Sequence, residues 1–146
     1  MTRILVINGP NLNLLGEREP GNYGQRSLED ILKELHYVAD SCGVALDAYQ
    51  SNSEGELVDR VQQAGRESVD YIILNPAAYT HSSVALRDAL LAVKIPFIEV
   101  HLSAVSAREP FRQVTYFADI AEGVISGFRG EGYLLALQAI LNRIEP

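Results

Sequence analysis

The chain has 146 residues, of which 47% are hydrophobic and 21% charged, with a formal net charge of -7 at pH 7. This length suits one domain, residues 1–146, which needs no disulfide or structural metal to bury a core. The negative charge argues against nucleic acid or an anionic membrane as a partner, and no apolar run is long enough to span a bilayer.

The first half of the chain predicts two strand–helix pairs. Residues 4–7 form a continuous apolar run that is typical of a buried strand. Ser27 and Asp30 have capping-box spacing and predict a helix that ends at Gly43. Residues 44–49 predict the second strand. Ser53 and Glu56 repeat the capping-box spacing before a second helix.

The second half continues the same alternation. Residues 69–74, 95–100 and 123–128 predict three further strands. A helix capped by Ser82 or Ser83 follows the third strand, a short helical turn covers residues 109–112, and the last helix runs from about residue 130 to 142. We expect the one cysteine, Cys42, to be a small buried residue; it excludes an internal disulfide and fits a cytoplasmic protein.

Five apolar strands separated by helices indicate right-handed βαβ units. We therefore predict an α/β protein with a three-layer flavodoxin-like fold and a five-stranded parallel sheet in the order 2-1-3-4-5. Ligands of such sheets bind beyond the carboxyl ends of the strands, where the strand order reverses. The loops after strands one, three and four should therefore form the site.

The first of these loops, residues 8–25, is 18 residues long and holds four Gly, two Pro and four Asn. Loops of this length are uncommon in compact domains unless they serve as lids or are disordered. Arg18 and Tyr23 stand on it and are candidates for the site. The alternatives are a solvated charge for Arg18, a packing role for Tyr23, and a turn role for Asn11 and Asn13.

The other two loops carry two histidines. Asn75 and His81 precede a predicted helix N-terminus, where anions are favoured, although a histidine there can be purely structural. Glu99 and His101 are two apart on a strand and therefore point to one face. A carboxylate can fix the tautomer of an imidazole, so His101 is a candidate general acid or base; the alternative is a surface pair.

Arg108 and Arg112 are four apart, and we expect them to share a helical face that meets an anionic or polyhydroxylated ligand. The sequence has no GxxxxGK[ST], GxGxxG, CxxC or HExxH pattern. We therefore expect no cofactor and no metal. A GxSxG element is also absent, which argues against a serine hydrolase.

Three ordered motifs carry a family resemblance. The strings ILVINGPNLNLLGEREPGNYG, NPAAYTHSS followed by ALRDAL, and IPFIEVHLSAVSAREPFR resemble type II 3-dehydroquinate dehydratases, and the similarity extends from Arg3 to the last helix. Ala77 replaces the glycine of the usual NPGAYTH pattern, and Ala104 and Ser106 depart from HLSNVHAR. These departures concern loop conformation and affinity more than the type of reaction.

The resemblance implies a cytoplasmic lyase of the shikimate pathway, a homododecamer built as a tetramer of trimers. It converts 3-dehydroquinate to 3-dehydroshikimate by anti elimination of water through an enolate, without a cofactor. Tyr23 would be the base that takes the C2 proton, with Arg18 favouring the tyrosinate, because an ordinary tyrosine is only about 0.1% ionised at pH 7. Asn11 would stabilise the enolate through a water, while His101, oriented by Glu99, would protonate the leaving hydroxyl.

The resemblance also implies substrate-binding residues. Side chains would bind the ring hydroxyls, two backbone N–H groups would hold the carboxylate, and one acidic residue would reach the site of a neighbouring subunit. The side chains are those of Asn75, His81 and Arg112. The two backbone N–H groups belong to Leu102 and Ser103, and the acidic residue is Asp88.

Two other classes of function stay open from the residues alone. One is a non-catalytic flavodoxin-like binding module, such as a receiver or a flavin carrier; a flavin carrier would purify yellow. The other is a small hydrolase or transferase that uses His101 with a serine, and it would be labelled by serine reagents.

Overall fold

A five-stranded parallel sheet forms the middle layer of the computed structural model, which describes residues 1–17 and 26–144. Its strand order is β2-β1-β3-β4-β5, which confirms the predicted order. Each predicted strand is present, with bounds that differ by one or two residues at most ends. The strands are β1 (Arg3–Asn8), β2 (Ala45–Gln50), β3 (Tyr71–Asn75), β4 (Phe97–His101) and β5 (Gly123–Ser126).

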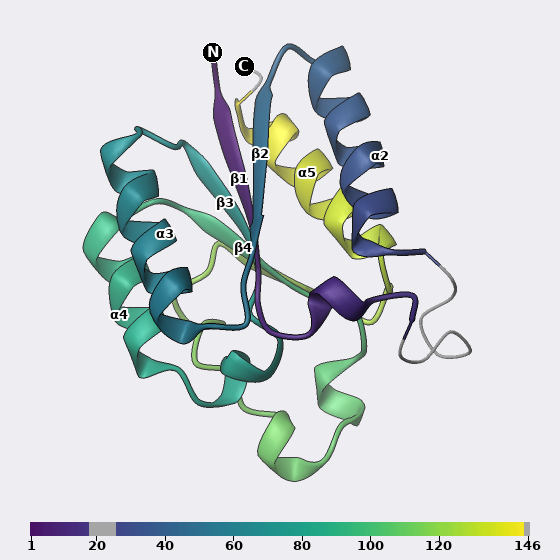
Figure 1. Cartoon of the computed structure of the whole chain (residues 1–146), viewed down its shortest axis with the longest axis vertical. Coiled ribbons are helices and arrows are strands. Elements are labelled where there is room, and N and C mark those ends of the chain that lie inside the picture. Colours follow the sequence, from purple (N-terminus) through teal and green to yellow (C-terminus); the bar gives the residue numbers. More distant parts are fainter. Residues whose placement is uncertain (18–25, 145–146) are drawn as a thin grey trace.

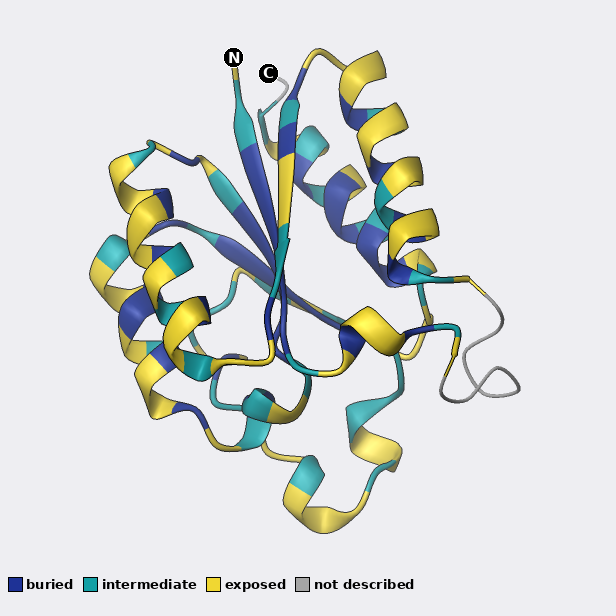
Figure 2. Cartoon of the chain, viewed as in Figure 1, coloured by how far each residue is buried: buried dark blue, intermediate teal, exposed yellow. Residues whose placement is uncertain are grey.

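Helices cover both faces of this sheet, as predicted (Figure 1). One face packs against α2 (Leu28–Ser41) and α5 (Glu131–Ile144), and the other against α3 (Glu54–Arg66) and α4 (Val84–Val93). The strands are the buried layer between two helical layers whose outer faces are exposed (Figure 2). In the described part of the chain, no helix combines the length and the apolar character needed to cross a membrane.

Side chains alternate between the two faces along each strand, which decides where the polar strand ends point. Ile73 packs in the core under α2 and α5, so Asn75, two residues later on β3, points to that same side. Phe97 packs under α3 and α4, so Glu99 and His101 on β4 point to the opposite side. The sheet therefore presents polar groups from both of its faces at one end.

The loops after β1 and β3 touch at Gly9. The Gly9 N–H donates to the carbonyl oxygen of Asn75 at 2.8 Å, and a Cβ on Gly9 would overlap the backbone carbonyl of Pro76. A residue with any side chain would push the two loops apart. The predicted loop of residues 8–25 is also more ordered at its start than expected, because Leu12–Leu14 forms a 3-10 turn, η1.

Two local expectations from the sequence need correction. Ser53 caps α3 by accepting the Glu56 N–H at 3.2 Å, but the Glu56 carboxylate accepts from Ser51 Oγ and does not complete a capping box. Cys42 is exposed and was expected to be buried. It is the C-cap of α2, three residues beyond the fully buried Ala39, where the helix has ended and the chain turns through solvent.

Candidate active site

A cavity of about 330 Å³ opens at the carboxyl ends of the strands, between the loops after β1, β3 and β4. That volume lies within the range of small-molecule sites. The cavity lies where the fold predicts a ligand site, and seven of the predicted site residues line it. They are Asn11, Asn75, His81, His101, Leu102, Ser103 and Arg112.

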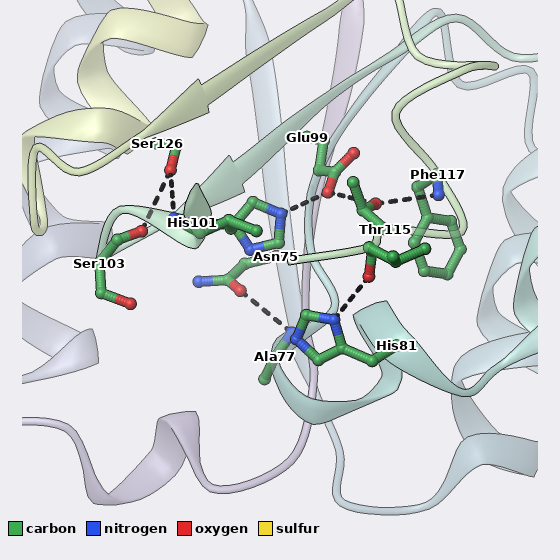
Figure 3. Close-up of polar contacts among 11 residues, drawn as sticks. Asn75, Ala77, His81, Glu99, His101, Ser103, Thr115, Phe117 and Ser126 are labelled. Atoms are coloured by element: carbon green, nitrogen blue, oxygen red, sulfur yellow. Dashed lines mark hydrogen bonds and ion pairs between the residues drawn. The ribbon is translucent and has the colours of Figure 1, made fainter. Parts of the chain in front are cut away.

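Behind the cavity wall, Glu99 holds His101. Glu99 is fully buried, and its Oε2 atom bonds Nε2 of His101 (Figure 3). Thr115 Oγ1 donates to the same oxygen at 2.7 Å. The Phe117 N–H donates to Thr115 Oγ1 at 3.0 Å, so this hydroxyl accepts from Phe117 and donates its hydrogen to Glu99. With Nε2 engaged, Nδ1 is the nitrogen of His101 that is available to a ligand.

Thr115 was missed by the sequence interpretation, because it stands 16 residues after Glu99 in an irregular segment with no motif around it. The second oxygen of Glu99, Oε1, is buried and has no hydrogen-bond partner among the described residues. The carboxylate therefore depends on the groups that meet Oε2.

His81 is anchored in a similar way. It ends the 3-10 turn η2 (Ala77–His81), and its Nδ1 lies 2.7 Å from the carbonyl oxygen of Val114 (Figure 3). A carbonyl only accepts, so Nδ1 carries a proton in this contact. In the neutral ring, Nε2 of His81 is then a hydrogen-bond acceptor. The purely structural role that the sequence left open for His81 involves only Nδ1. The ring also lines the cavity.

Asn75 is 3% exposed and is held at both ends of its amide. Its Oδ1 accepts the Ala77 N–H at 3.1 Å, and its Nδ2 donates to Tyr133 Oη at 2.9 Å. Tyr133 Oη in turn donates to Asn8 Oδ1 at 2.5 Å. Neither Tyr133 nor Asn8 was predicted from the sequence as part of the site, since α5 lies far from both loops along the chain.

The loop after β4 is fixed by its own hydrogen bonds. Ser126 Oγ donates to the carbonyl of Ser103 at 3.1 Å and accepts the Val105 N–H at 3.0 Å, while Ser103 Oγ accepts from Arg108 at 2.8 Å. No hydrogen bond within residues 1–17 and 26–144 uses the backbone N–H of Leu102 or Ser103. These two donors are thus available at the cavity wall.

Arg108 and Arg112 do not share a helical face, contrary to the prediction. They lie at the ends of two separate 3-10 turns, η3 (Val105–Ala107) and η4 (Pro110–Arg112), because a helix is interrupted at Pro110. Both still line the cavity, and both pair with Glu109. The pKa of Glu109 is lowered, first by its own backbone N–H and then by Arg112 and Arg108. The three side chains together leave positive charge at this edge of the cavity.

Three predicted residues lie elsewhere or outside the described part of the chain. Asp88 is an exposed residue of α4 that borders a separate surface hollow beside Thr115 and the Arg87–Asp119 ion pair. It does not line the cavity of its own chain. Arg18 and Tyr23 lie outside the described residues, so their roles stay predictions.

Asn11 lines the cavity from the loop after β1. Asn11 has a left-handed backbone, with φ of 70°, and its N–H donates to Asn52 Oδ1 at 2.9 Å. Its turn role is therefore present together with its place in the cavity wall.

Within residues 1–17 and 26–144, no group of three or more His, Cys, Asp or Glu side chains is placed to hold a metal ion.

Comparison with known proteins decides the family. The model of the family described as "Dehydroquinase class II" matches residues 2–141. The chain belongs to the class II dehydroquinase family. A relative from Idiomarina loihiensis named 3-dehydroquinate dehydratase is 61% identical over 142 residues, covering 97% of this chain and 93% of the relative. One of the same name from Legionella pneumophila is 59% identical, covering 99% and 100%.

Solved structures of this family have the same fold. The crystal structure of type II dehydroquinase from Butyrivibrio crossotus superposes with a TM-score of 0.92 at 43% identity, and 97% of each chain is covered. That of Propionibacterium acnes gives a TM-score of 0.91 at 36% identity, again over 97% of each chain. The resemblance predicted from the three motifs is thereby confirmed.

One departure from the usual motif of the family has a visible structural consequence. Ala77 has a φ of 53°, in the left-handed region that suits glycine. An alanine there carries a steric cost of about 1–2 kcal/mol from its Cβ. The Ala77 N–H holds Asn75 Oδ1, so the strained residue directly supports a side chain of the cavity.

We expect Ala77→Gly to raise the free energy of unfolding by about 0.5–1 kcal/mol, because the relieved strain exceeds the added entropy of the unfolded chain. Ala78→Gly is the matched control: Ala78 is exposed in the same turn and has no positive φ, so its replacement should lower stability by about 0.5–1 kcal/mol. Denaturant unfolding measures both. A loss of stability in Ala77→Gly would contradict the strain assigned to this turn.

Proposed function

We propose that this chain is a type II 3-dehydroquinate dehydratase, which removes water from 3-dehydroquinate to give 3-dehydroshikimate in the shikimate pathway. The observation that carries the proposal is the buried Glu99–His101 pair at the cavity, in a chain 61% identical to a 3-dehydroquinate dehydratase. The alternative of a flavodoxin-like binding module is not favoured, because relatives matched over nearly their whole length are named as this enzyme.

The reaction begins with proton removal next to the ketone. Tyr23, as tyrosinate, takes the C2 proton, and the electron pair of the C–H bond moves toward the ketone oxygen to form an enolate. Arg18 favours the ionised phenol through its positive charge. Asn11, which lines the cavity, stabilises the enolate oxygen through a water.

The leaving hydroxyl departs with a proton from His101. The enolate electrons form the C=C bond as the C–O bond breaks, and the protonated hydroxyl leaves as water. Nδ1 of His101 supplies this proton while Nε2 stays on Glu99, whose carboxylate stabilises the imidazolium before transfer. Thr115 holds the carboxylate in place.

Substrate binding uses both hydrogen-bond donors and a hydrogen-bond acceptor. The anchored amide of Asn75, the Nε2 acceptor of His81 and the guanidinium of Arg112 meet the ring hydroxyls. The backbone N–H groups of Leu102 and Ser103 meet the carboxylate, and the positive charge at the arginine edge favours an anion there.

We also propose a homododecamer, a tetramer of trimers, in which Asp88 reaches the site of a neighbouring subunit. Val84, Asp88 and Leu91 lie on one face of α4, and 56% of Val84 and 46% of Leu91 is exposed. Such apolar exposure around an acidic residue suits a protein interface. Residues 1–146 act as one catalytic domain in this assembly, and we place it in the cytoplasm.

The activity is tested by mixing EDTA-treated protein with 3-dehydroquinate and following the ultraviolet absorbance of the conjugated enone. We expect a rise, and the same rise after borohydride treatment in the presence of substrate, which would trap a lysine imine. Tyr23→Phe should lower turnover by about 10²- to 10⁴-fold, as loss of a general base does. Tyr37→Phe, at an exposed tyrosine of α2, is the control. Folded protein that forms no enone would refute the proposal.

Thr115→Val removes the hydroxyl that donates to Glu99 and should lower kcat by about tenfold with little change in KM, since a hydrogen bond to a charged group is lost. Thr115→Ser keeps the hydroxyl and should restore most of kcat. Steady-state kinetics with both variants separates this positioning role from a general loss of packing, in which serine would not restore turnover.

The assembly is tested by light scattering on the purified protein. We expect a particle about twelve times the 16.1 kDa mass of the chain. Asp88→Asn should leave this mass unchanged while lowering activity. A stable, fully active monomer would contradict both the dodecamer and the role of Asp88 in a neighbouring site.

A further inference from the structure

A chain of three buried polar side chains backs the cavity on the α5 side of the sheet. Asn8 and Asn75 are register partners at the ends of β1 and β3, and Tyr133 reaches them from the first turn of α5. Asn8 and Tyr133 are fully buried, and Asn75 is 3% exposed. Among the described residues, Tyr133 is the one side chain that links the two amides: its hydroxyl lies 2.9 Å from Asn75 Nδ2 and 2.5 Å from Asn8 Oδ1.

The direction of each hydrogen bond in this chain follows from one fixed donor. The Ala77 N–H can only donate, so the atom of Asn75 that faces it is the oxygen, Oδ1 (Figure 3). Nδ2 therefore faces Tyr133 and donates to the phenol oxygen. The phenol hydrogen must then point to Asn8 Oδ1.

Tyr133 keeps this hydrogen throughout the ordinary pH range. Burial raises the pKa of its phenol well above the usual value, while the bond from Asn75 opposes this only in part. A neutral phenol inside the protein is both donor and acceptor, as the chain requires. The second N–H of Asn75 Nδ2 has no partner within residues 1–17 and 26–144, and Asn75 lines the cavity.

We propose that Tyr133 is a positioning residue that holds the Asn75 amide in the orientation set by the Ala77 N–H, so that Asn75 presents an N–H donor to the cavity and selects a ligand with an acceptor there. The inference rests on the proposed function for its ligand, a ring hydroxyl of 3-dehydroquinate. Without the phenol, Nδ2 loses its acceptor, and of the hydrogen bonds that the amide makes to described residues the one from the Ala77 N–H is left.

Tyr133→Phe tests this inference. It should raise KM for 3-dehydroquinate about three- to tenfold and change kcat by less than about threefold, because the lost interaction is made equally in the ground and transition states. Tyr71→Phe is the matched control: this partly buried tyrosine packs on the same core from β3, and no hydrogen bond of its phenol is seen among the described residues. It should leave KM unchanged.

A second background separates positioning from packing. In an Asn75→Ala protein, adding Tyr133→Phe should raise KM no further, since the amide through which Tyr133 acts is gone. An equal rise in KM in both backgrounds, or an unchanged KM in Tyr133→Phe alone, would overturn the inference. Wild-type enzyme that forms no enone would instead refute the proposed function, so the two failures are distinct.

Neutron diffraction on the wild-type protein tests the hydrogen-bond directions even if Tyr133→Phe does not fold. We expect the phenol deuteron of Tyr133 to lie toward Asn8 Oδ1 and one Asn75 Nδ2 deuteron to lie toward the phenol oxygen. A phenol deuteron directed at Asn75 would mean that the amide is reversed, and the inference would be wrong.

Discussion

The covering of a parallel sheet on both faces is the constraint on which the rest of this molecule depends. Strands buried on two sides have no room for unpaired polar side chains along their length, because each would lose its water without gaining a partner. The polar residues are accordingly concentrated at the carboxyl ends. Asn8, Asn75 and His101 are the last residues of β1, β3 and β4, and all three are buried. Period-two alternation then sends Asn75 toward α5 and His101 toward α3 and α4, so a ligand at the sheet end meets groups from both faces.

Much of this arrangement was predictable, because it depends on patterns that are local in the sequence. Apolar runs, cap residues and the spacing of Glu99 and His101 indicated the strands, the helices and one face of β4, and the fold class then indicated the strand order. Predictions from local patterns were wrong where an adjacent residue or the end of a helix decides the conformation or the exposure of a residue. The expected helical face of Arg108 and Arg112 is interrupted at Pro110, and Cys42 is exposed because α2 ends just before it.

The residues that support the site could not be found in this way. Thr115 and Tyr133 become relevant only when the fold brings them beside Glu99 and Asn75, across 16 and 58 residues of the chain. Neither residue type signals chemistry at its own position. A threonine in a loop and a tyrosine in the first turn of a helix are ordinary until the atoms they face are known.

The supporting contacts follow one rule at three cavity side chains, His101, His81 and Asn75: one polar atom is bonded to the protein and another is left for the ligand. His101 gives Nε2 to Glu99 and keeps Nδ1, while His81 gives Nδ1 to the carbonyl of Val114 and keeps Nε2. Asn75 is held by Ala77 and Tyr133 and keeps one N–H. Rings and amides held in this way have little rotamer freedom left to lose when a ligand binds, and their donor and acceptor roles are already assigned. The specificity of the site therefore depends as much on Glu99, Val114 and Tyr133, which need not touch the ligand, as on the side chains that do.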